Sequence, residues 1–146
     1  MLRTLLSILA IGFASGPSFA GGMAVCLWSP LPKDHPDSIN FSYRWCNSSK
    51  CLDWTKESLR GSQGKPQTNM LGIEIKSGLS FDIRFDRSFD AGYQEQQYKL
   101  APRYFEALEG NENEICASNA AYKFVRLGNG IDLKKGCPTE AKSCPD

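Results

Sequence analysis

Residues 38–59, SINFSYRWCNSSKCLDWTKESL, carry the clearest structural signal in the chain. From Ile39 to Trp45, large apolar side chains alternate with polar ones. An alternation with a period of two is typical of a β-strand that buries one face. Four polar residues then separate Cys46 from Cys51, and a second run follows. This stretch therefore predicts a β-hairpin.

The two cysteines set a register for this hairpin. With Cys46 opposite Cys51, three more cross-strand pairs follow: Arg44 with Asp53, Tyr43 with Trp54, and Trp45 with Leu52. One register thus gives a disulfide, a charge pair and two apolar pairs, each a favourable cross-strand contact. We therefore predict a Cys46–Cys51 disulfide and expect Tyr43 to lie beside Trp54.

Residues 1–20 have the pattern of a secretory signal peptide. Arg3 gives a positive start, an apolar run extends from Leu5 to Phe13, and Ser18-Phe19-Ala20 is a small-x-small cleavage site. The apolar run is much shorter than the ~20 residues that a membrane-spanning helix needs. We expect an exported protein, extracellular or alternatively periplasmic in a bacterium. Residues 21–146 would then be one secreted, disulfide-rich β-domain without a membrane span.

The distribution of charge and of metal-binding residue types argues against two classes of partner, nucleic acids and metal ions. The chain has 17 Lys and Arg against 16 Asp and Glu, and no basic run exceeds Lys134-Lys135. Nucleic-acid binders carry a basic surplus on one face, so we expect no nucleic-acid partner. There is no Cys-x-x-Cys spacing, and the single histidine, His35, is far from any cysteine pair. This pattern does not fit zinc, and we expect no metal and no cofactor.

Further alternating runs indicate the fold class. Residues 71–86 have the pattern of a second hairpin with a tight turn at Ser77-Gly78. Residues 93–100, 122–127 and 131–133 are predicted strands, whereas residues 21–25 are expected to form a loose N-terminal segment. Short strands separated by turns predict a mainly all-β fold, a small antiparallel sandwich or barrel of about six to seven strands.

One segment has a helical signal. Residues 102–109 begin with Pro102, continue with good helix formers and are followed by Gly110. Proline at the first helical position and glycine after the last one favour a short helix. A strand with Tyr104, Glu106 and Leu108 on one face is the alternative.

The cysteine count predicts three disulfides. All six cysteines follow the signal segment, and an even number in a small exported chain favours complete pairing. Besides Cys46–Cys51, we expect Cys26–Cys144 to fasten the termini and Cys116–Cys137 to cross the last hairpin. Cys26–Cys116 with Cys137–Cys144 is the alternative.

The sequence assigns no catalytic residue. A Ser-His-Asp arrangement would have to use His35, which lies in a proline-rich segment, and no Gly-x-Ser-x-Gly element is present. A glycosidase needs only two carboxylates at a set separation. Asp82, Asp86, Glu106 and Glu114 are candidates for that role, so a small secreted glycan hydrolase is the third functional hypothesis.

The first and second functional hypotheses are both binding functions. The first hypothesis is a secreted, non-catalytic binding protein, effector-like or inhibitor-like, that acts on an extracellular protein. The second is a carbohydrate-binding, lectin-like module in which exposed aromatic rings of Tyr43 and Trp54 form the ligand platform.

Two asparagines match the N-glycosylation pattern. The sequence contains Asn40-Phe41-Ser42 and Asn47-Ser48-Ser49, so Asn40 and Asn47 are predicted acceptor sites of a possible glycoprotein.

Overall fold

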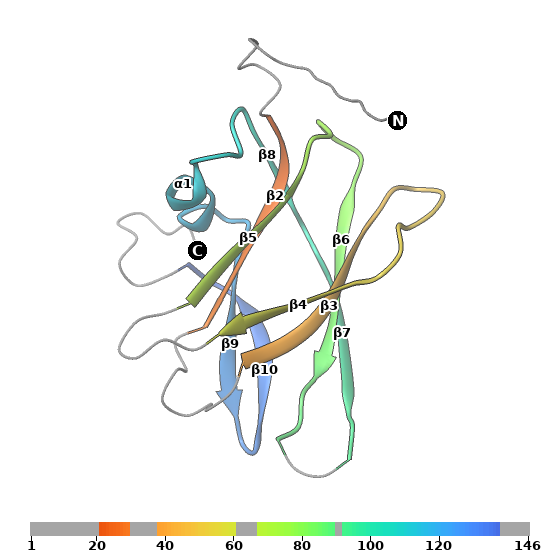
Figure 1. Cartoon of the computed structure of the whole chain (residues 1–146), viewed down its shortest axis with the longest axis vertical. Helices are drawn as coiled ribbons and strands as arrows, with labels where there is room; N and C mark the ends of the chain where they lie inside the picture. The colour runs from red at the N-terminus through yellow and green to blue at the C-terminus, as the bar shows by residue number, and fades with distance from the viewer. Residues whose placement is uncertain (1–20, 30–37, 61–66, 90–91, 138–146) are drawn as a thin grey trace, which may run out of the picture.

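Two β-sheets pack face to face in the computed structural model, which describes residues 21–29, 38–60, 67–89 and 92–137 (Figure 1). The strands are β2 (Gly22–Ser29), β3 (Ser38–Cys46), β4 (Thr55–Arg60), β5 (Gln67–Ile73), β6 (Ser80–Asp86), β7 (Glu95–Leu100), β8 (Arg103–Phe105), β9 (Ala121–Leu127) and β10 (Gly130–Lys135); the helix is α1 (Glu112–Cys116). The predicted mainly β class is confirmed. The sheets are not closed into a barrel, and the described residues form more strands than the six or seven expected.

The chain moves repeatedly between the two sheets. The first, five-stranded sheet has the order β10-β9-β2-β5, and β8 also pairs with β2. The second, four-stranded sheet has the order β4-β3-β6-β7, and all its pairs are antiparallel. In the first sheet β2 runs parallel to β9 and antiparallel to β5 and β8. Most neighbours in space are therefore not neighbours in the sequence.

β2 is the central strand of the first sheet, and all eight of its residues are buried. Val25 and Leu27 on one face join the core between the sheets, while Ala24 and Cys26 on the other join a smaller cluster that includes residues of α1. A Cβ at Gly22 would lie 2.1 Å from the carbonyl oxygen of Ile73, so only glycine fits there. The expectation of a loose segment at residues 21–25 was wrong, because this stretch is paired with β5 on one edge and β8 on the other.

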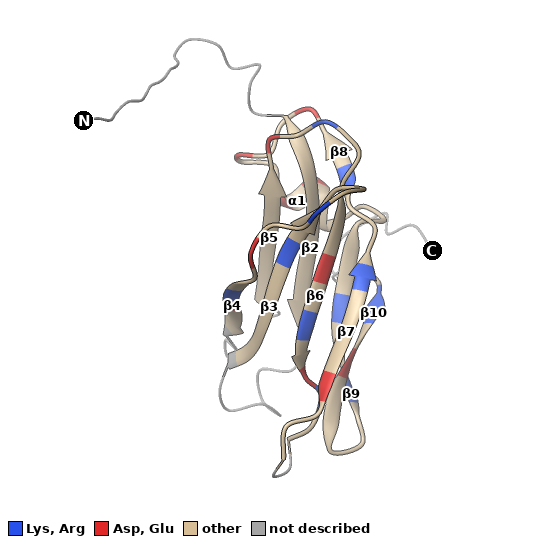
Figure 2. Cartoon of the chain, turned by 90° about the vertical axis from the view of Figure 1, so that its right-hand side faces the viewer, with Lys and Arg blue, Asp and Glu red and all other residues tan. Residues whose placement is uncertain are grey.

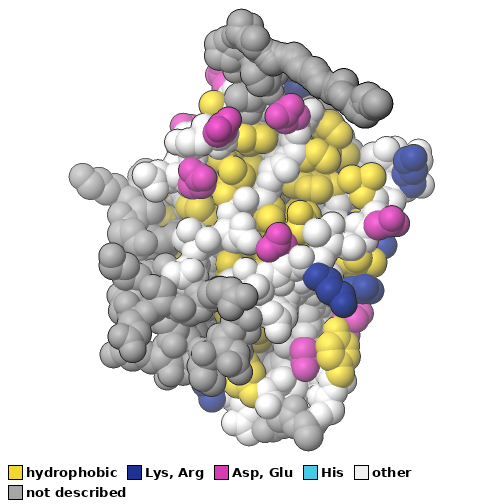
Figure 3. Space-filling view, in the orientation of Figure 1, with side chains coloured by type: hydrophobic (Ala, Val, Ile, Leu, Met, Phe, Trp, Pro, Cys, Tyr) yellow, Lys and Arg dark blue, Asp and Glu magenta, His cyan; other side chains and the backbone are white. Residues whose placement is uncertain are grey.

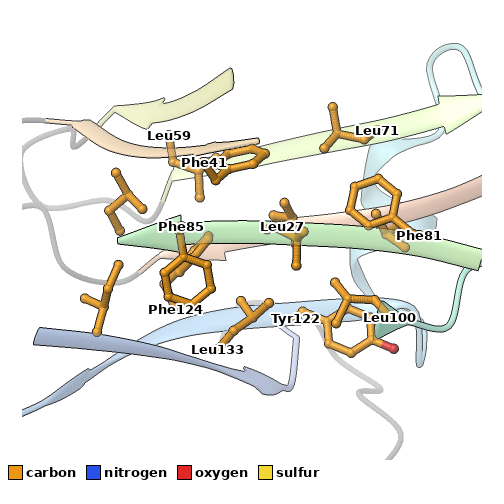
Figure 4. Packing of buried hydrophobic residues seen from close by; sticks show 14 of the residues in the cluster. Leu27, Phe41, Leu59, Leu71, Phe81, Phe85, Leu100, Tyr122, Phe124 and Leu133 are labelled. Atoms are coloured by element: carbon orange, nitrogen blue, oxygen red, sulfur yellow. The ribbon is translucent and has the colours of Figure 1, made fainter. Parts of the chain in front are cut away.

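The core between the sheets is rich in aromatic rings. Phe124 of the first sheet meets Phe85 of the second edge to face, with the ring centroids 5.3 Å apart, and the centroid of the Phe41 ring is 6.2 Å from that of Phe124. Figure 4 shows these rings between the two layers, together with Leu27, Leu71 and Leu133 from the first sheet. Burying one such side chain stabilises the fold by about 1.5–3 kcal/mol, so this core fixes how the sheets face each other.

The expected hairpin over residues 71–86 does not form. β5 pairs with β2 in the first sheet, whereas β6 pairs with β3 and β7 in the second. The alternation predicted from Phe81 to Phe85 buries its three apolar side chains, whereas Ile75, predicted on the buried side of the first run, is exposed beyond the end of β5. Residues 74–79 carry the chain from one sheet to the other. Alternation identifies which face of a strand is buried and does not identify its partner strand.

The helix expected over residues 102–109 was also wrong. Residues 103–105 form β8, which pairs with the start of β2, and Phe105 and Leu108 are buried. The helix, α1, lies one segment later, and its Ile115 and Cys116 are buried against the outer face of β2. An edge of β2 was available for pairing there, which overrode the weak local helix signal.

Two disulfides are described, Cys46–Cys51 and Cys26–Cys116. The first is the pair that the hairpin register predicted. The second belongs to the alternative pairing, so the expected Cys26–Cys144 and Cys116–Cys137 bonds were wrong. Cys26 lies on the outer face of β2, where α1 places Cys116 with a Cα–Cα distance of 5.1 Å. Cys137 is also disulfide-bonded, and Cys144 lies outside the described residues.

Two tyrosines join the sheets along the side where β7 faces β10. The Tyr98 hydroxyl of β7 donates a hydrogen bond to the Asp132 carboxylate of β10. The Tyr122 hydroxyl accepts from the Ala101 N–H at 3.1 Å and donates to the Ala101 carbonyl at 3.3 Å. Burial, then the hydrogen bond to Asp132 and its negative charge, raise the pKa of Tyr98 from 10 to about 12.

Backbone contacts close the end of the molecule where the β6–β7 loop meets the β9–β10 turn. Ser88 and Gly130 form an isolated bridge, and the Phe89 N–H donates to the Asn129 carbonyl at 2.8 Å. Among the described residues no helix is long and apolar enough to cross a membrane. The predicted signal segment and His35 lie outside the described residues.

The two described disulfides should contribute unequally to stability. Cys26 and Cys116 are 90 residues apart, and Cys46 and Cys51 are 5 apart. Loop-closure entropy then predicts that the free energy of unfolding falls by about 4.5 kcal/mol in the Cys26→Ser/Cys116→Ser variant and by about 2 kcal/mol in Cys46→Ser/Cys51→Ser. Denaturant unfolding of both variants measures the difference. Equal losses, or a larger loss from the short bridge, would contradict the entropic account.

The hydrogen bond from Tyr98 should make stability depend on alkaline pH. Since its folded pKa is raised to about 12, the native state keeps a proton that the unfolded state releases near pH 10. Stability from this group is complete below pH 10 and is lost as the pH rises to about 12. At neutral pH the free energy of unfolding of the wild type should exceed that of Tyr98→Phe by about 1–2 kcal/mol, and this difference should shrink between pH 10 and about pH 12. A gap that stays constant in urea unfolding would exclude the linkage.

Candidate functional site

The outer face of the four-stranded sheet is the main polar surface that the strands build. Because β3 and β6 bury every second residue in the core, the intervening residues point away from it. We call this surface the polar face, and its members are Asn40, Ser42, Arg44, Lys56, Ser58, Asp82, Arg84, Asp86, Gln97 and Lys99. Figure 2 shows charged residues of both signs along β3, β6 and β7 on this side.

An extra residue in the β3–β4 hairpin places Trp54 on the polar face. Leu52 N–H donates to the Trp45 carbonyl at 2.9 Å, as the cysteine register requires, but Tyr43 is paired with Thr55. Three residues, 52–54, therefore lie between Cys51 and Thr55, whereas only two, 44 and 45, lie between their partners on β3. Such a bulge moves the following side chains to the other face.

The bulge overturns two expected pairs. Tyr43 does not face Trp54: its ring stacks on Phe81 of the core, with the centroids 5.3 Å apart. Burial, and next the charge of Glu57, raise the pKa of the Tyr43 hydroxyl. Arg44 does not pair with Asp53 and instead contacts Trp54 and Asp82. Tyr43 and Trp54 thus lie on opposite faces, and the two-ring ligand platform is wrong.

Trp54 is held by two arginines. The guanidinium carbon of Arg44 lies 4.2 Å from the centre of the Trp54 ring, and that of Arg84 lies 4.1 Å from it. Each cation–π contact of this kind contributes about 0.5–1 kcal/mol at an exposed site. The half-buried Trp54 ring is therefore fixed in place over the sheet.

A buried carboxylate anchors this arrangement. Asp82 is only 4% exposed, and its two oxygens contact Arg44 Nε at 3.1 Å and Lys99 Nζ at 3.2 Å. β3 and β7 flank β6, so Asp82 receives one cation from each side. A buried charge is tolerated when it is paired in this way. Asp82 thus orients Arg44 beneath Trp54.

Beside Trp54 the polar face is hollowed. The hollow has a volume of about 630 Å³ and is lined by Asn40, Phe41, Ser42, Lys56, Glu57, Ser58, Arg84, Phe85, Asp86 and Tyr93. Lys56 and Arg84 each pair across the sheet with Ser42, which lies between them. The floor of the hollow therefore offers hydroxyl, amide and cationic groups.

Tyr93 stands at the edge of the hollow and is 65% exposed. Asp86 Oδ1 accepts the backbone N–H groups of Ser88 at 3.1 Å and Gln94 at 3.0 Å, and so shapes the loop that carries Tyr93. Partial burial, then the hydrogen bond to Glu95, raise the pKa of the Tyr93 hydroxyl, and the charge of Arg84 opposes this shift. Asp86 is therefore engaged in shaping this turn.

The predicted acceptor asparagines lie on this part of the molecule. Asn40 lines the hollow, and Asn47 lies in the turn of the β3–β4 hairpin. Asn47 Oδ1 accepts the N–H groups of Ser49 at 2.7 Å and Lys50 at 2.8 Å, which fixes the turn. Both side chains are exposed, so the geometry leaves them accessible.

The candidate catalytic carboxylates are not gathered together. Of Asp82, Asp86, Glu106 and Glu114, only Asp86 lines the hollow, and Asp82 is bound to two cations. Glu114 belongs to α1, on the first sheet. Cys46, Cys51 and Asp82 lie close enough together for a metal, but the two sulfurs are bonded to each other and are not thiolate ligands.

Exposed hydrophobic side chains are spread over the molecule. Those of large size are Leu52, Ile75, Phe89, Tyr93, Tyr104 and Leu127. In the view of Figure 3, hydrophobic surface appears mainly in the upper half and is broken up by acidic side chains. Tyr93 alone among them lines the hollow.

Sequence reasoning selected Trp54 but missed Lys56, Arg84 and Tyr93. In the alternation of β6, the side chain of Arg84 points to the face away from the buried Phe85, so the position of Arg84 on the outer face was predictable. Its position beside Trp54 was not, because that depends on β6 pairing with β3. Comparisons with protein-family models, with curated proteins and with solved structures gave no match.

Proposed function

We propose that this chain is a secreted, non-catalytic binding protein whose polar face contacts an extracellular protein. The observation that carries the proposal is the contact of the Trp54 ring with the guanidinium groups of both Arg44 and Arg84, with Tyr93 at the edge of the adjacent hollow. Tryptophan, tyrosine and arginine are the residues most enriched at the energetic centres of protein interfaces. Two disulfides fit an oxidising, extracellular setting.

The rigidity of this surface supports a binding role. Asp82 fixes Arg44, the arginines fix Trp54, and Asp86 fixes the loop of Tyr93. Side chains that are ordered before association lose less conformational entropy when a partner binds. An effector-like or inhibitor-like protein would use such a preorganised surface to hold its target without chemistry.

Trp54 should be the residue on which partner capture depends. We expect quantitative capture from extracellular protein fractions to recover a partner with the wild type. With Trp54→Ala the amount of partner recovered should fall at least tenfold, because truncating such a residue typically reduces the binding free energy by about 2 kcal/mol or more. Tyr104→Ala, which truncates an exposed aromatic ring on β8 of the first sheet, is the matched control. Thermal unfolding verifies that each variant is folded. The same captured proteins with wild type and Trp54→Ala would refute the proposal.

A carbohydrate-binding module is the second candidate, and the hollow is the observation that favours it. Its floor of Asn40, Ser42 and Ser58 offers hydrogen-bonding groups to sugar hydroxyls, and Tyr93 supplies an aromatic wall. Sugars commonly bind where a ring face adjoins such polar groups. A single ring, Tyr93, would replace the pair expected from the sequence.

Co-sedimentation separates the candidates. The purified, oxidised protein is mixed with insoluble chitin, cellulose and β-glucan, and released reducing sugar is measured in the same tubes. Under the first proposal the protein stays in the supernatant and releases no sugar. Sedimentation that Tyr93→Ala abolishes would instead support the carbohydrate-binding module. Sedimentation with sugar release would support the glycan hydrolase.

A further inference from the structure

Three residues form a row across the floor of the hollow. Ser42 of β3 is paired with Lys56 of β4 on one side and with Arg84 of β6 on the other. Neighbouring strands are about 4.8 Å apart, so the backbones of the two cationic residues are about 10 Å apart, with a hydroxyl between them. Long Lys and Arg side chains from both sides can reach one small anionic group above Ser42.

Within the part of the chain that the structure describes, the two cations of this row form no ion pair. Among the described residues, Arg44 and Lys99 form ion pairs with Asp82, whereas neither Lys56 nor Arg84 has a carboxylate within 4 Å. Arg84 is nevertheless held in position by its contact with the Trp54 ring, 4.1 Å away. The row therefore presents one preorganised cation, Arg84, and a second cation, Lys56, in the lining of the same hollow.

We propose that the hollow binds a single carboxylate carried by the partner protein, an Asp or Glu side chain flanked by neutral residues. The carboxylate lies above Ser42, accepts hydrogen bonds from Lys56 and Arg84, and sets the register of the partner on the polar face. Charge-assisted hydrogen bonds are about twice as strong as neutral ones and are strongly directional. This inference rests on the proposed protein-binding function and adds the chemistry of the bound segment.

The residues around the row favour a ligand with a single carboxylate over a polymer with many carboxylates. Asp86 and Glu57 also line the hollow, and Glu57 follows Lys56 on β4. A polyuronate has a carboxylate on every sugar, so its neighbouring charges would meet these acidic groups at an energetic cost. A protein segment with one acidic residue among neutral ones avoids that repulsion.

Amide chemical shifts of the isotope-labelled, oxidised protein, made without glycans, test the site. The probe is acetyl-Ala-Glu-Ala-amide, and acetyl-Ala-Gln-Ala-amide is the neutral control. We expect the Glu peptide alone to shift the amides of Ser42, Lys56 and Arg84. Lys56→Gln should weaken its binding about fivefold, and added salt should weaken it further. Lys134→Gln, an exposed change on β10, should leave the affinity unchanged.

The inference is overturned by equal shifts with both peptides, by an affinity that is unchanged in Lys56→Gln, or by binding of polygalacturonate in preference to the Glu peptide. Ser42→Ala, which keeps both cations, gives a second variant and should also reduce affinity. The capture experiment with Trp54→Ala is independent of this one. Capture that depends on Trp54 without a response to the Glu peptide would refute the carboxylate site and leave the proposed function standing.

Discussion

The structure depends on the burial of β2 from both sides. Val25 and Leu27 face the core between the sheets, while Cys26 on the other face is bonded to Cys116 at the end of α1. A strand that is buried on both faces must satisfy its backbone groups by pairing on both edges. β5 occupies one edge, and β8 and β9 share the other. Segments from both halves of the chain are thereby drawn into one sheet.

The second sheet then has one face committed to the core and one face left for function. Phe41, Phe81 and Phe85 point inward, so the alternate residues form the polar face. Two local devices turn that face into a defined surface: the bulge that brings Trp54 onto it, and the buried Asp82 that holds Arg44 and Lys99. Neither stabilises the core directly, and both order side chains that a partner would meet.

Much of the strand content could be predicted from the sequence, because alternation is a local property. The strand from Ile39 to Trp45, the run from Phe81 to Phe85 and the Cys46–Cys51 bond all follow from residues close together in the chain. The pairing partners did not follow. Residues 71–86 looked like one hairpin and belong to two sheets, since the partner of a strand is decided by the whole packing arrangement.

The sequence by itself determined the β class, the buried faces of β3 and β6 and the short disulfide. Each depends on side-chain period or on cysteines brought together by a turn. Only the tertiary structure decided that the N-terminal segment is the central strand, that Cys26 pairs with Cys116, and that Trp54 meets Arg84. These contacts join residues far apart in the chain, and they form because covering both faces of β2 allows few arrangements of the remaining strands.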